Sequence, residues 1–193
     1  DVTALLAFRK KLKEEGHAFS VNDFVLKAVA KALRRHPEIL VSLDGEQIIR
    51  RAHVNLGMAV ALDAGLIVPV IRDADLLSLE ALSAKAKDLA ERARANQLGA
   101  DEYKGSTFTV SNLGMFGIGN FTAIINAPEA AILSVSSVRK TPVVITDENG
   151  EDTIAIRPMM NIQLSVDHRL IDGLLASQFV EYMKQLLENP VQI

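Results

Sequence analysis

Apolar residues recur at helical spacing in four segments of the chain, so we expect four helices. The first runs from a cap at Asp1 or Thr3 to Gly16, and the second follows a cap at Ser20 or Asn22. The second should end before His36, because the residue preceding a proline avoids the helical region. The other two predicted helices span residues 78–96 and 173–188.

Apolar and polar residues alternate, or apolar residues run together, in the segments between these helices, which predicts strands. Residues 41–43 and 47–50 flank Asp44-Gly45, a pair typical of a hairpin turn. Further strands are expected at 54–62, 66–71, 106–111, near 122–125, 130–138, 143–146 and 153–166. No repeat or linker interrupts the series. The pattern predicts one α+β domain, with a mixed sheet covered by helices on one face.

Composition excludes several classes of function. Apolar residues make up 49% and charged residues 23%, and the net charge is −3, so no basic field favours nucleic acid. The chain has no cysteine, which rules out disulfides, cysteine-based zinc sites and an acyl-cysteine intermediate. The apolar run 127–138 is interrupted by Pro128 and Glu129 and is too short to cross a membrane. Because the chain begins with Asp1 instead of methionine, we expect it to be part of a longer protein.

His168 is the strongest candidate for chemistry. It lies between the predicted last strand and last helix, with Asp172 four residues later. A histidine titrates near neutral pH, as a general base requires. The alternative interpretation makes His168 a hydrogen-bonded junction residue and Asp172 the helix N-cap. The other histidines, His17, His36 and His53, show no metal-ligand spacing.

Ser111 and Asn112 form a second candidate group. A predicted strand delivers them to a loop rich in glycine, which begins at Gly114. A hydroxyl at a strand end could donate to the oxyanion of a tetrahedral intermediate. The loop lacks the lysine and the spacing of known phosphate-binding loops, so a simple polar turn is the competing interpretation.

Four motifs together resemble the catalytic domain of the dihydrolipoamide acyltransferases, the core component of 2-oxo acid dehydrogenase complexes. The resemblance covers essentially the whole chain, in order. It implies that the family domain has a first helix and an adjoining strand upstream of Asp1, with an arginine that pairs with the motif aspartate. The matching segments are D-H-R-L-I-D-G at 167–173, L-I-V-P-V at 66–70, F-T-V-S-N at 108–112 and I-N-A-P-E-A-A-I-L at 125–133.

The resemblance implies an α/β two-layer fold like that of chloramphenicol acetyltransferase, and a domain covering residues 1–193. It implies acetyl transfer between a dihydrolipoyl arm and coenzyme A by direct thioester–thiol exchange, without a metal. In this scheme His168 is the general base, Ser111 binds the oxyanion and Asp172 maintains the geometry near His168. The coenzyme A contacts it implies are Arg9, Ser20, Asp63, Ser111, Asn112, Ser136 and Val138, with Arg9 and Ser20 at the phosphate end.

The resemblance also implies partners. A homotrimer would assemble into a core of 24 or 60 subunits, which binds a lipoyl domain, a decarboxylase and dihydrolipoamide dehydrogenase, in the bacterial cytoplasm or the mitochondrial matrix. No nucleic acid or membrane is implied. The loop from Asn112 to Gly117 is most similar to the acetyl-transferring branch, in a pyruvate or acetoin complex. Two alternatives remain: a non-catalytic core protein of such a complex, and an acetyltransferase for a free small molecule.

Overall fold

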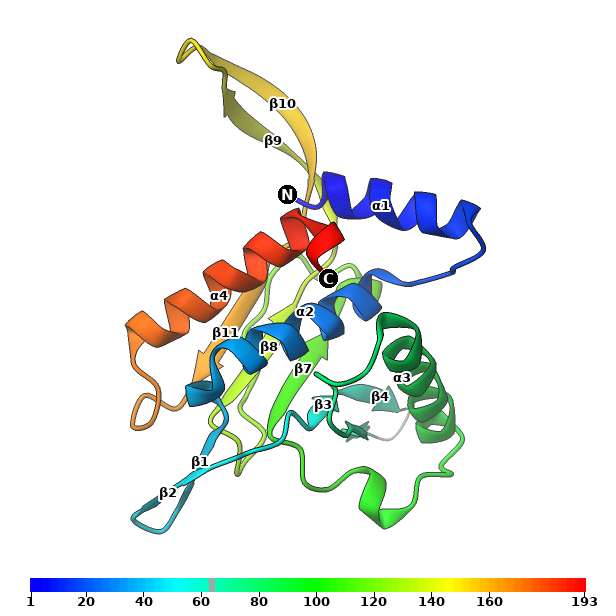
Figure 1. Cartoon of the computed structure of the whole chain (residues 1–193), viewed down its shortest axis with the longest axis vertical. Coiled ribbons are helices and arrows are strands. Elements are labelled where there is room, and N and C mark those ends of the chain that lie inside the picture. The colour runs from blue at the N-terminus through cyan, green and yellow to red at the C-terminus, as the bar shows by residue number, and fades with distance from the viewer. Residues whose placement is uncertain (63–64) are drawn as a thin grey trace.

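A five-stranded mixed sheet forms the centre of the computed structural model, which describes residues 1–62 and 65–193. Its strands lie in the order β11–β8–β7–β3–β6, and β7 runs parallel to both β3 and β8 (Figure 1). β6 and β11 run antiparallel to their neighbours. The strands are β3 (Leu56–Met58), β6 (Val70–Ile71), β7 (Phe108–Asn112), β8 (Ala131–Val135) and β11 (Ile162–Val166). The predicted mixed sheet is therefore confirmed.

The four predicted helices are present, and three of them begin at predicted residues. They are α1 (Thr3–Glu14), α2 (Val21–Arg35), α3 (Leu79–Arg94) and α4 (Gly173–Glu188). Ser20 caps α2 in a reciprocal capping box with Asp23, and the side chains of Ser78 and Asp172 accept N-terminal hydrogen bonds of α3 and α4. Short 3-10 turns occur at Pro37–Ile39, Ala100–Glu102, Gly114–Phe116 and Pro190–Gln192.

The hydrophobic core lies between the sheet and the pair of helices α2 and α4, which cross in front of it in Figure 1. The ring of Phe108 on β7 packs against Phe179 on α4, with their centroids 5.7 Å apart. Side chains alternate along a strand, so Thr109 and Ser111 lie on the other face of the sheet. The side chains of Thr109 and Ser111 are therefore on the face of the sheet that is turned away from the core and from α4.

Three predicted strands are divided in the structure. Residues 54–62 and 66–71 give β3 and β6 of the central sheet, and also the separate ribbon of β4 (Val60–Leu62) and β5 (Gly65–Ile67). Residues 63 and 64, which connect β4 to β5, lie outside the described residues. Residues 153–166 give β10 (Asp152–Met159) and β11, which belong to different sheets. The alternation of apolar and polar residues continues from β10 into β11, so the sequence gives no sign of the boundary between the two strands.

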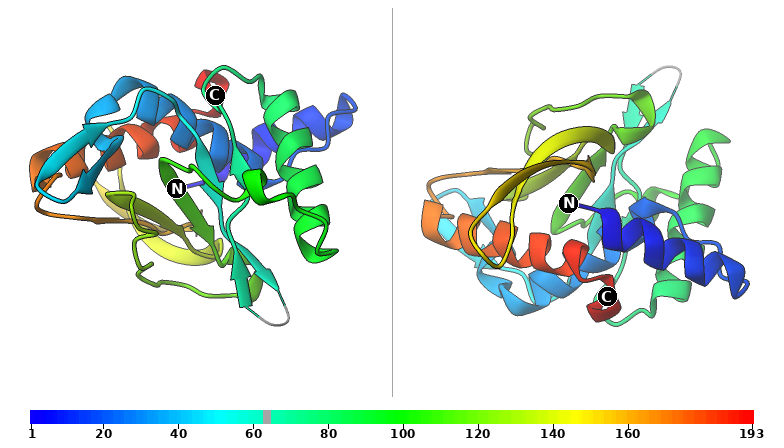
Figure 2. Two further views of the ribbon diagram at one scale, coloured as in Figure 1. Left: turned by 90° about the horizontal axis from the view of Figure 1, so that it is seen from below. Right: turned by 90° about the horizontal axis from the view of Figure 1, so that it is seen from above.

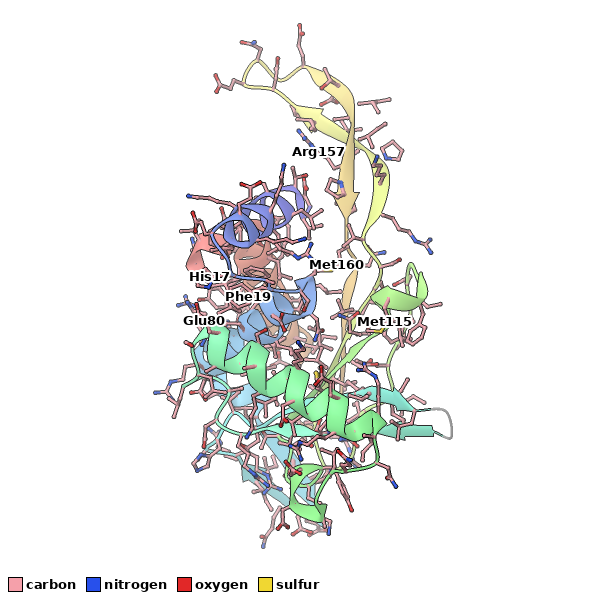
Figure 3. All side chains as sticks on the ribbon, turned by 90° about the vertical axis from the view of Figure 1, so that its right-hand side faces the viewer. His17, Phe19, Glu80, Met115, Arg157 and Met160 are labelled. Carbon is pink, nitrogen blue, oxygen red and sulfur yellow. The ribbon has the colours of Figure 1, made fainter. Side chains whose placement is uncertain are left out.

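β10 pairs with β9 (Arg139–Thr146) in a hairpin that projects from the body of the domain (Figures 1 and 2). Figure 3 shows Arg157 on this hairpin and Met160 where the chain returns to the body. β1 (Val41–Asp44) and β2 (Gln47–Arg50) form the smaller predicted hairpin, which is confirmed.

The strand expected near residues 122–125 is wrong. This segment forms no ladder, and it crosses the second face of the sheet instead. Its backbone is bound by side chains: Ser134 donates to the carbonyl of Phe121, and Ser165 donates to the carbonyl of Ala123. Those hydroxyls replace the backbone partners that a strand would supply.

Candidate active site

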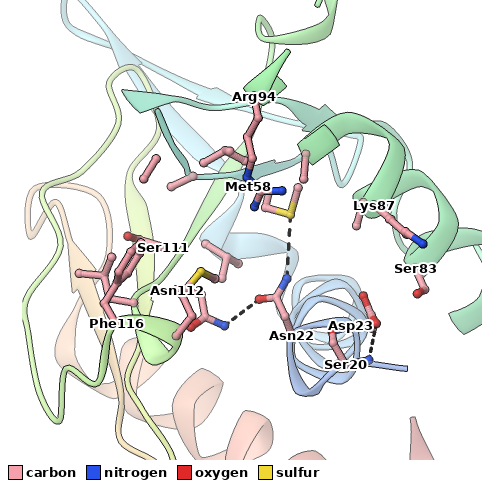
Figure 4. A pocket seen from close by; sticks show the side chains of 18 of the residues that line it. Ser20, Asn22, Asp23, Met58, Ser83, Lys87, Arg94, Ser111, Asn112 and Phe116 are labelled. Atoms are coloured by element: carbon pink, nitrogen blue, oxygen red, sulfur yellow. Dashed lines mark hydrogen bonds between the residues drawn. The ribbon is translucent and has the colours of Figure 1, made fainter. Parts of the chain in front are cut away.

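A pocket of about 590 Å³ opens where α3, the start of α2 and the ribbon β4–β5 meet the end of β7 (Figure 4). The polar end of β7 therefore reaches a cavity large enough for an extended ligand arm. Its lining includes Ser20, Asn22, Met58, Ser83, Lys87, Arg94, Ser111, Asn112, Met115 and Phe116.

Ser111 and Asn112 are the last two residues of β7, so this strand sets their positions. Ser111 is half-buried, and Asn112 donates its side-chain N–H to Asn22 Oδ1 at 2.8 Å. The Asn112 Oδ1 atom accepts the backbone N–H of Gly114 at 2.8 Å. A Cβ at Gly114 would lie 3.0 Å from that oxygen and 3.1 Å from the carbonyl oxygen of Ser136, so the turn favours glycine. The strand end thus presents the Ser111 hydroxyl from a rigid element.

Ser20 also lines the pocket, where its hydroxyl belongs to the capping box of α2. It donates to Asp23 Oδ2 at 2.8 Å and accepts the Asp23 backbone N–H at 3.2 Å. Asp23 is buried, so its carboxylate is committed to this cap.

Three other residues implied for coenzyme A, Arg9, Ser136 and Val138, lie apart from the pocket lining. Arg9 donates from Nε to the carbonyl of Phe19 at 2.6 Å. Ser136 is buried, and its N–H bonds the carbonyl of Asn161 at 3.0 Å, while Val138 is exposed before β9. Asp63 lies outside the described residues.

His168 stands on an exposed turn between β11 and α4. Asp167 anchors that turn: its N–H bonds the carbonyl of Ala130 at 2.8 Å, and its carboxylate pairs with Arg169 at 2.6 Å. The Arg169 guanidinium holds the pKa of Asp167 at about 2, well below the usual value. Asp172 accepts the Leu175 N–H at 2.8 Å, which confirms its role as N-cap.

The sheet register separates His168 from Ser111 within one chain. Ser111 lies opposite Ser134, and Ser134 lies opposite Gln163 of β11. β11 then runs three residues further, to Val166, before the turn with His168 begins, and this is about 10 Å of extended chain. The two candidate catalytic groups are therefore at opposite ends of the sheet.

Lys87 and Arg94 are pocket residues that the sequence analysis missed. Both cations share the face of α3 that carries Ala86 and Ala90 and borders the pocket. Their spacing of seven residues, two helical turns, was the available signal. Within the described part of the chain, no cluster of three acidic or histidine side chains has metal-binding geometry, and no helix is both long and apolar enough to span a membrane.

Comparison with known proteins identifies the family to which this chain belongs. The family model for the catalytic domain of 2-oxoacid dehydrogenases acyltransferase matches residues 1–193. The chain belongs to this family.

Relatives and solved structures agree with that assignment. The acetyltransferase component of the mitochondrial pyruvate dehydrogenase complex of Schizosaccharomyces pombe is 43% identical over 100% of this chain and 39% of its own length. A probable dihydrolipoamide acetyltransferase of Listeria monocytogenes is 40% identical with a TM-score of 0.89, covering 98% of this chain and 81% of that one. The cubic core of a pyruvate dehydrogenase multienzyme complex is 42% identical with a TM-score of 0.88, covering 97% and 78%.

A chloramphenicol acetyltransferase shares the fold at 18% identity and a TM-score of 0.57, covering 93% of this chain and 82% of that one. The fold class expected from the sequence is confirmed. The chain spans about two fifths of the length of the curated relatives it matches.

Proposed function

We propose that this chain is the catalytic domain of a dihydrolipoyllysine-residue acetyltransferase, which transfers an acetyl group between a dihydrolipoyl arm and coenzyme A. The observation that carries the proposal is the family match over residues 1–193, together with Ser111 presented by β7 to a pocket of about 590 Å³. The preference for acetyl rests on relatives such as those of Schizosaccharomyces pombe and Zymomonas mobilis, which are named as acetyltransferases of pyruvate dehydrogenase complexes.

His168 acts as the general base in the proposed reaction. It takes the proton from the attacking thiol, whose reference pKa near 8.5 leaves little thiolate at pH 7. The sulfur forms a bond to the thioester carbon, and the oxyanion accepts a hydrogen bond from the Ser111 hydroxyl. When the intermediate collapses, the bond to the departing sulfur breaks, and that sulfur recovers the proton. Asp172 contributes by fixing the start of α4, and hence the end of the His168 turn.

The active site is proposed to form between subunits of a trimer. His168 and Ser111 lie at opposite ends of the sheet in one chain, so Ser111 needs His168 of the partner subunit to complete the reaction. The exposed position of His168 supports this arrangement, because the side chain is free to enter a neighbouring pocket. A three-fold assembly gives each interface one complete site.

We propose that the trimers build a multimeric core of 24 or 60 subunits, with lipoyl domain, decarboxylase and dihydrolipoamide dehydrogenase as partners. The proposal is supported by the likeness to a solved cubic core of a pyruvate dehydrogenase multienzyme complex. Coenzyme A and the lipoyl group are substrates here, and no metal takes part. The proposed compartment is the bacterial cytoplasm or the mitochondrial matrix, and the relative in Schizosaccharomyces pombe is named as mitochondrial.

Replacing His168 tests the proposal. The exposed His168→Ala variant should fold normally and lose about 10²–10⁴-fold of the acetyl transfer from acetyl-CoA to dihydrolipoamide, the usual contribution of a general base. Folding is checked by circular dichroism and assembly by sedimentation. Near-normal turnover in the assembled variant would refute the assignment.

A further inference from the structure

Polar groups on either side of the β9–β10 hairpin hold the loop that follows β7. This loop, residues 113–121, contains a 3-10 turn but belongs to no strand. Ser137, shortly before β9, donates from its backbone N–H and its hydroxyl to the carbonyl of Ile118 at 2.7 Å and 2.9 Å. Asn161, shortly after β10, donates from Nδ2 to the carbonyl of Gly119 at 2.9 Å. These donors satisfy loop carbonyls that have no strand beside them.

Arg139, the first residue of β9, fastens the part of the loop nearest to the pocket. It donates to the carbonyl of Gly117, and its Nε donates to the Ser137 hydroxyl at 3.1 Å. Among the described residues, it is the one side chain that bonds to the backbone of residues 115–117. Its guanidinium lies on Gly119, where an added Cβ would stand 2.5 Å from Nη1 and 2.6 Å from Cζ. Glycine at position 119 therefore permits this contact.

Met115 and Phe116 line the pocket just before this fastening point. Their side chains are 71% and 59% exposed, so packing within one chain does little to hold them. Figure 4 shows Phe116 on the β7 side of the pocket, near Ser111. Ser111 is fixed by β7 within the sheet, whereas Met115 and Phe116 belong to the loop. The position of this wall of the pocket therefore depends on the hydrogen bond at Gly117.

We propose that Arg139 is a positioning residue, which holds the loop so that Met115 and Phe116 form a fixed wall before a substrate arm enters the pocket. The inference rests on the proposed function and adds to it a residue outside the pocket lining. A loop that is fixed in advance does not have to be ordered when the ligand binds, so binding is stronger. Because the wall contacts the ground state and the transition state alike, its loss should appear in KM.

Steady-state kinetics of Arg139→Met in the assembled protein test this proposal. The substrate to vary is acetyl-CoA, because three contacts implied for coenzyme A by the family resemblance, Ser20, Ser111 and Asn112, line this pocket. KM for acetyl-CoA should rise roughly 3- to 10-fold, the cost of ordering one or two side chains on binding. The kcat should stay within about twofold of wild type, since β7 still positions Ser111.

Gly119→Ala tests the contact with Arg139 left in place. The added Cβ occupies the position of the guanidinium, so this variant should raise KM as Arg139→Met does. The double variant should be no worse than either single variant, because both changes remove the same contact. Arg139→Lys retains one donor for the Gly117 carbonyl, and its KM should fall between wild type and Arg139→Met. Additive effects of the two substitutions would contradict the proposed contact.

Lys140→Met is the matched control. Lys140 is the next residue of β9 and is exposed, and it bonds to no loop residue among those described. Amide hydrogen exchange of residues 113–119 should become faster in Arg139→Met and stay unchanged in Lys140→Met, whatever the activity. An unchanged acetyl-CoA KM in Arg139→Met would overturn the proposal, even if exchange became faster. A loss confined to kcat would overturn it as well.

Calorimetric titration with coenzyme A separates this inference from the proposed function. A wild-type protein that binds coenzyme A without transferring acetyl refutes the function alone. In that case the Kd of Arg139→Met still decides the positioning role, which an unchanged Kd refutes. A wild-type protein that binds no coenzyme A overturns both.

Discussion

Mixing two inactive variants tests whether the catalytic groups come from different subunits. His168→Ala retains Ser111, and Ser111→Ala retains His168. Within one chain the sheet register places these side chains beyond hydrogen-bond reach, with about 10 Å of β11 between the level of Ser111 and the His168 turn. Neither variant alone contains a complete site.

The activity expected from the mixture can be calculated by assuming that the two variants combine at random. In an equal mixture, an interface receives intact His168 from one chain and intact Ser111 from its neighbour in about one quarter of cases, because each choice has an even chance around the three-fold ring. Every mixed trimer holds one such interface, and every pure trimer holds none. We therefore expect about a quarter of wild-type activity per subunit, against a background of about 1% or less for either variant alone.

The variants should be unfolded and refolded together, and acetyl transfer measured after mass spectrometry has verified mixed trimers. The same variants refolded separately and then combined provide the control, which should remain inactive if trimers do not exchange. Verified mixed trimers without recovered activity would place both residues in one subunit and refute the shared site.

Three further predictions concern single residues. Ser111→Ala should lower kcat about 10²–10³-fold with little change in KM, whereas a pure KM effect would make Ser111 a ligand-positioning residue. Asp172→Ala removes the cap on the Leu175 N–H and should cost about 1 kcal/mol in urea unfolding, and no loss would contradict that role. Burial raises the pKa of Glu129, so the protonated form stabilises the fold and that contribution is lost as pH rises through the raised pKa. Glu129→Gln should therefore gain stability relative to wild type as the pH rises above the unperturbed glutamate pKa of about 4.3, and a difference that does not change with pH would contradict this.

Local signals in the sequence determined the helices and one hairpin. Ser20, Ser78 and Asp172 were readable as helix starts, because a side-chain cap acts within three residues of its own position. Asp44-Gly45 likewise identified the hairpin between β1 and β2. The candidate residues His168 and Ser111 could be selected by residue type and by their place at strand ends. Their motifs also indicated the family, which the comparisons confirm.

The sequence did not reveal which strands pair with one another, and only the tertiary structure shows this. Alternation along residues 153–166 is continuous, yet the chain leaves one sheet and joins another near Met160, because pairing depends on distant segments. The strand expected near residues 122–125 failed for the same reason: hydroxyls of Ser134 and Ser165 bind that backbone where no strand lies beside it.

The organisation of the site was also decided by packing. The helical spacing of Lys87 and Arg94 puts them on one face, but the position of α3 against β4 and the end of β7 turns that face into a pocket wall. Likewise, only the register of β7, β8 and β11 places Ser111 and His168 at opposite ends of the sheet. Caps and periodicity act over a few residues, whereas register and helix docking come from contacts between segments far apart in the chain.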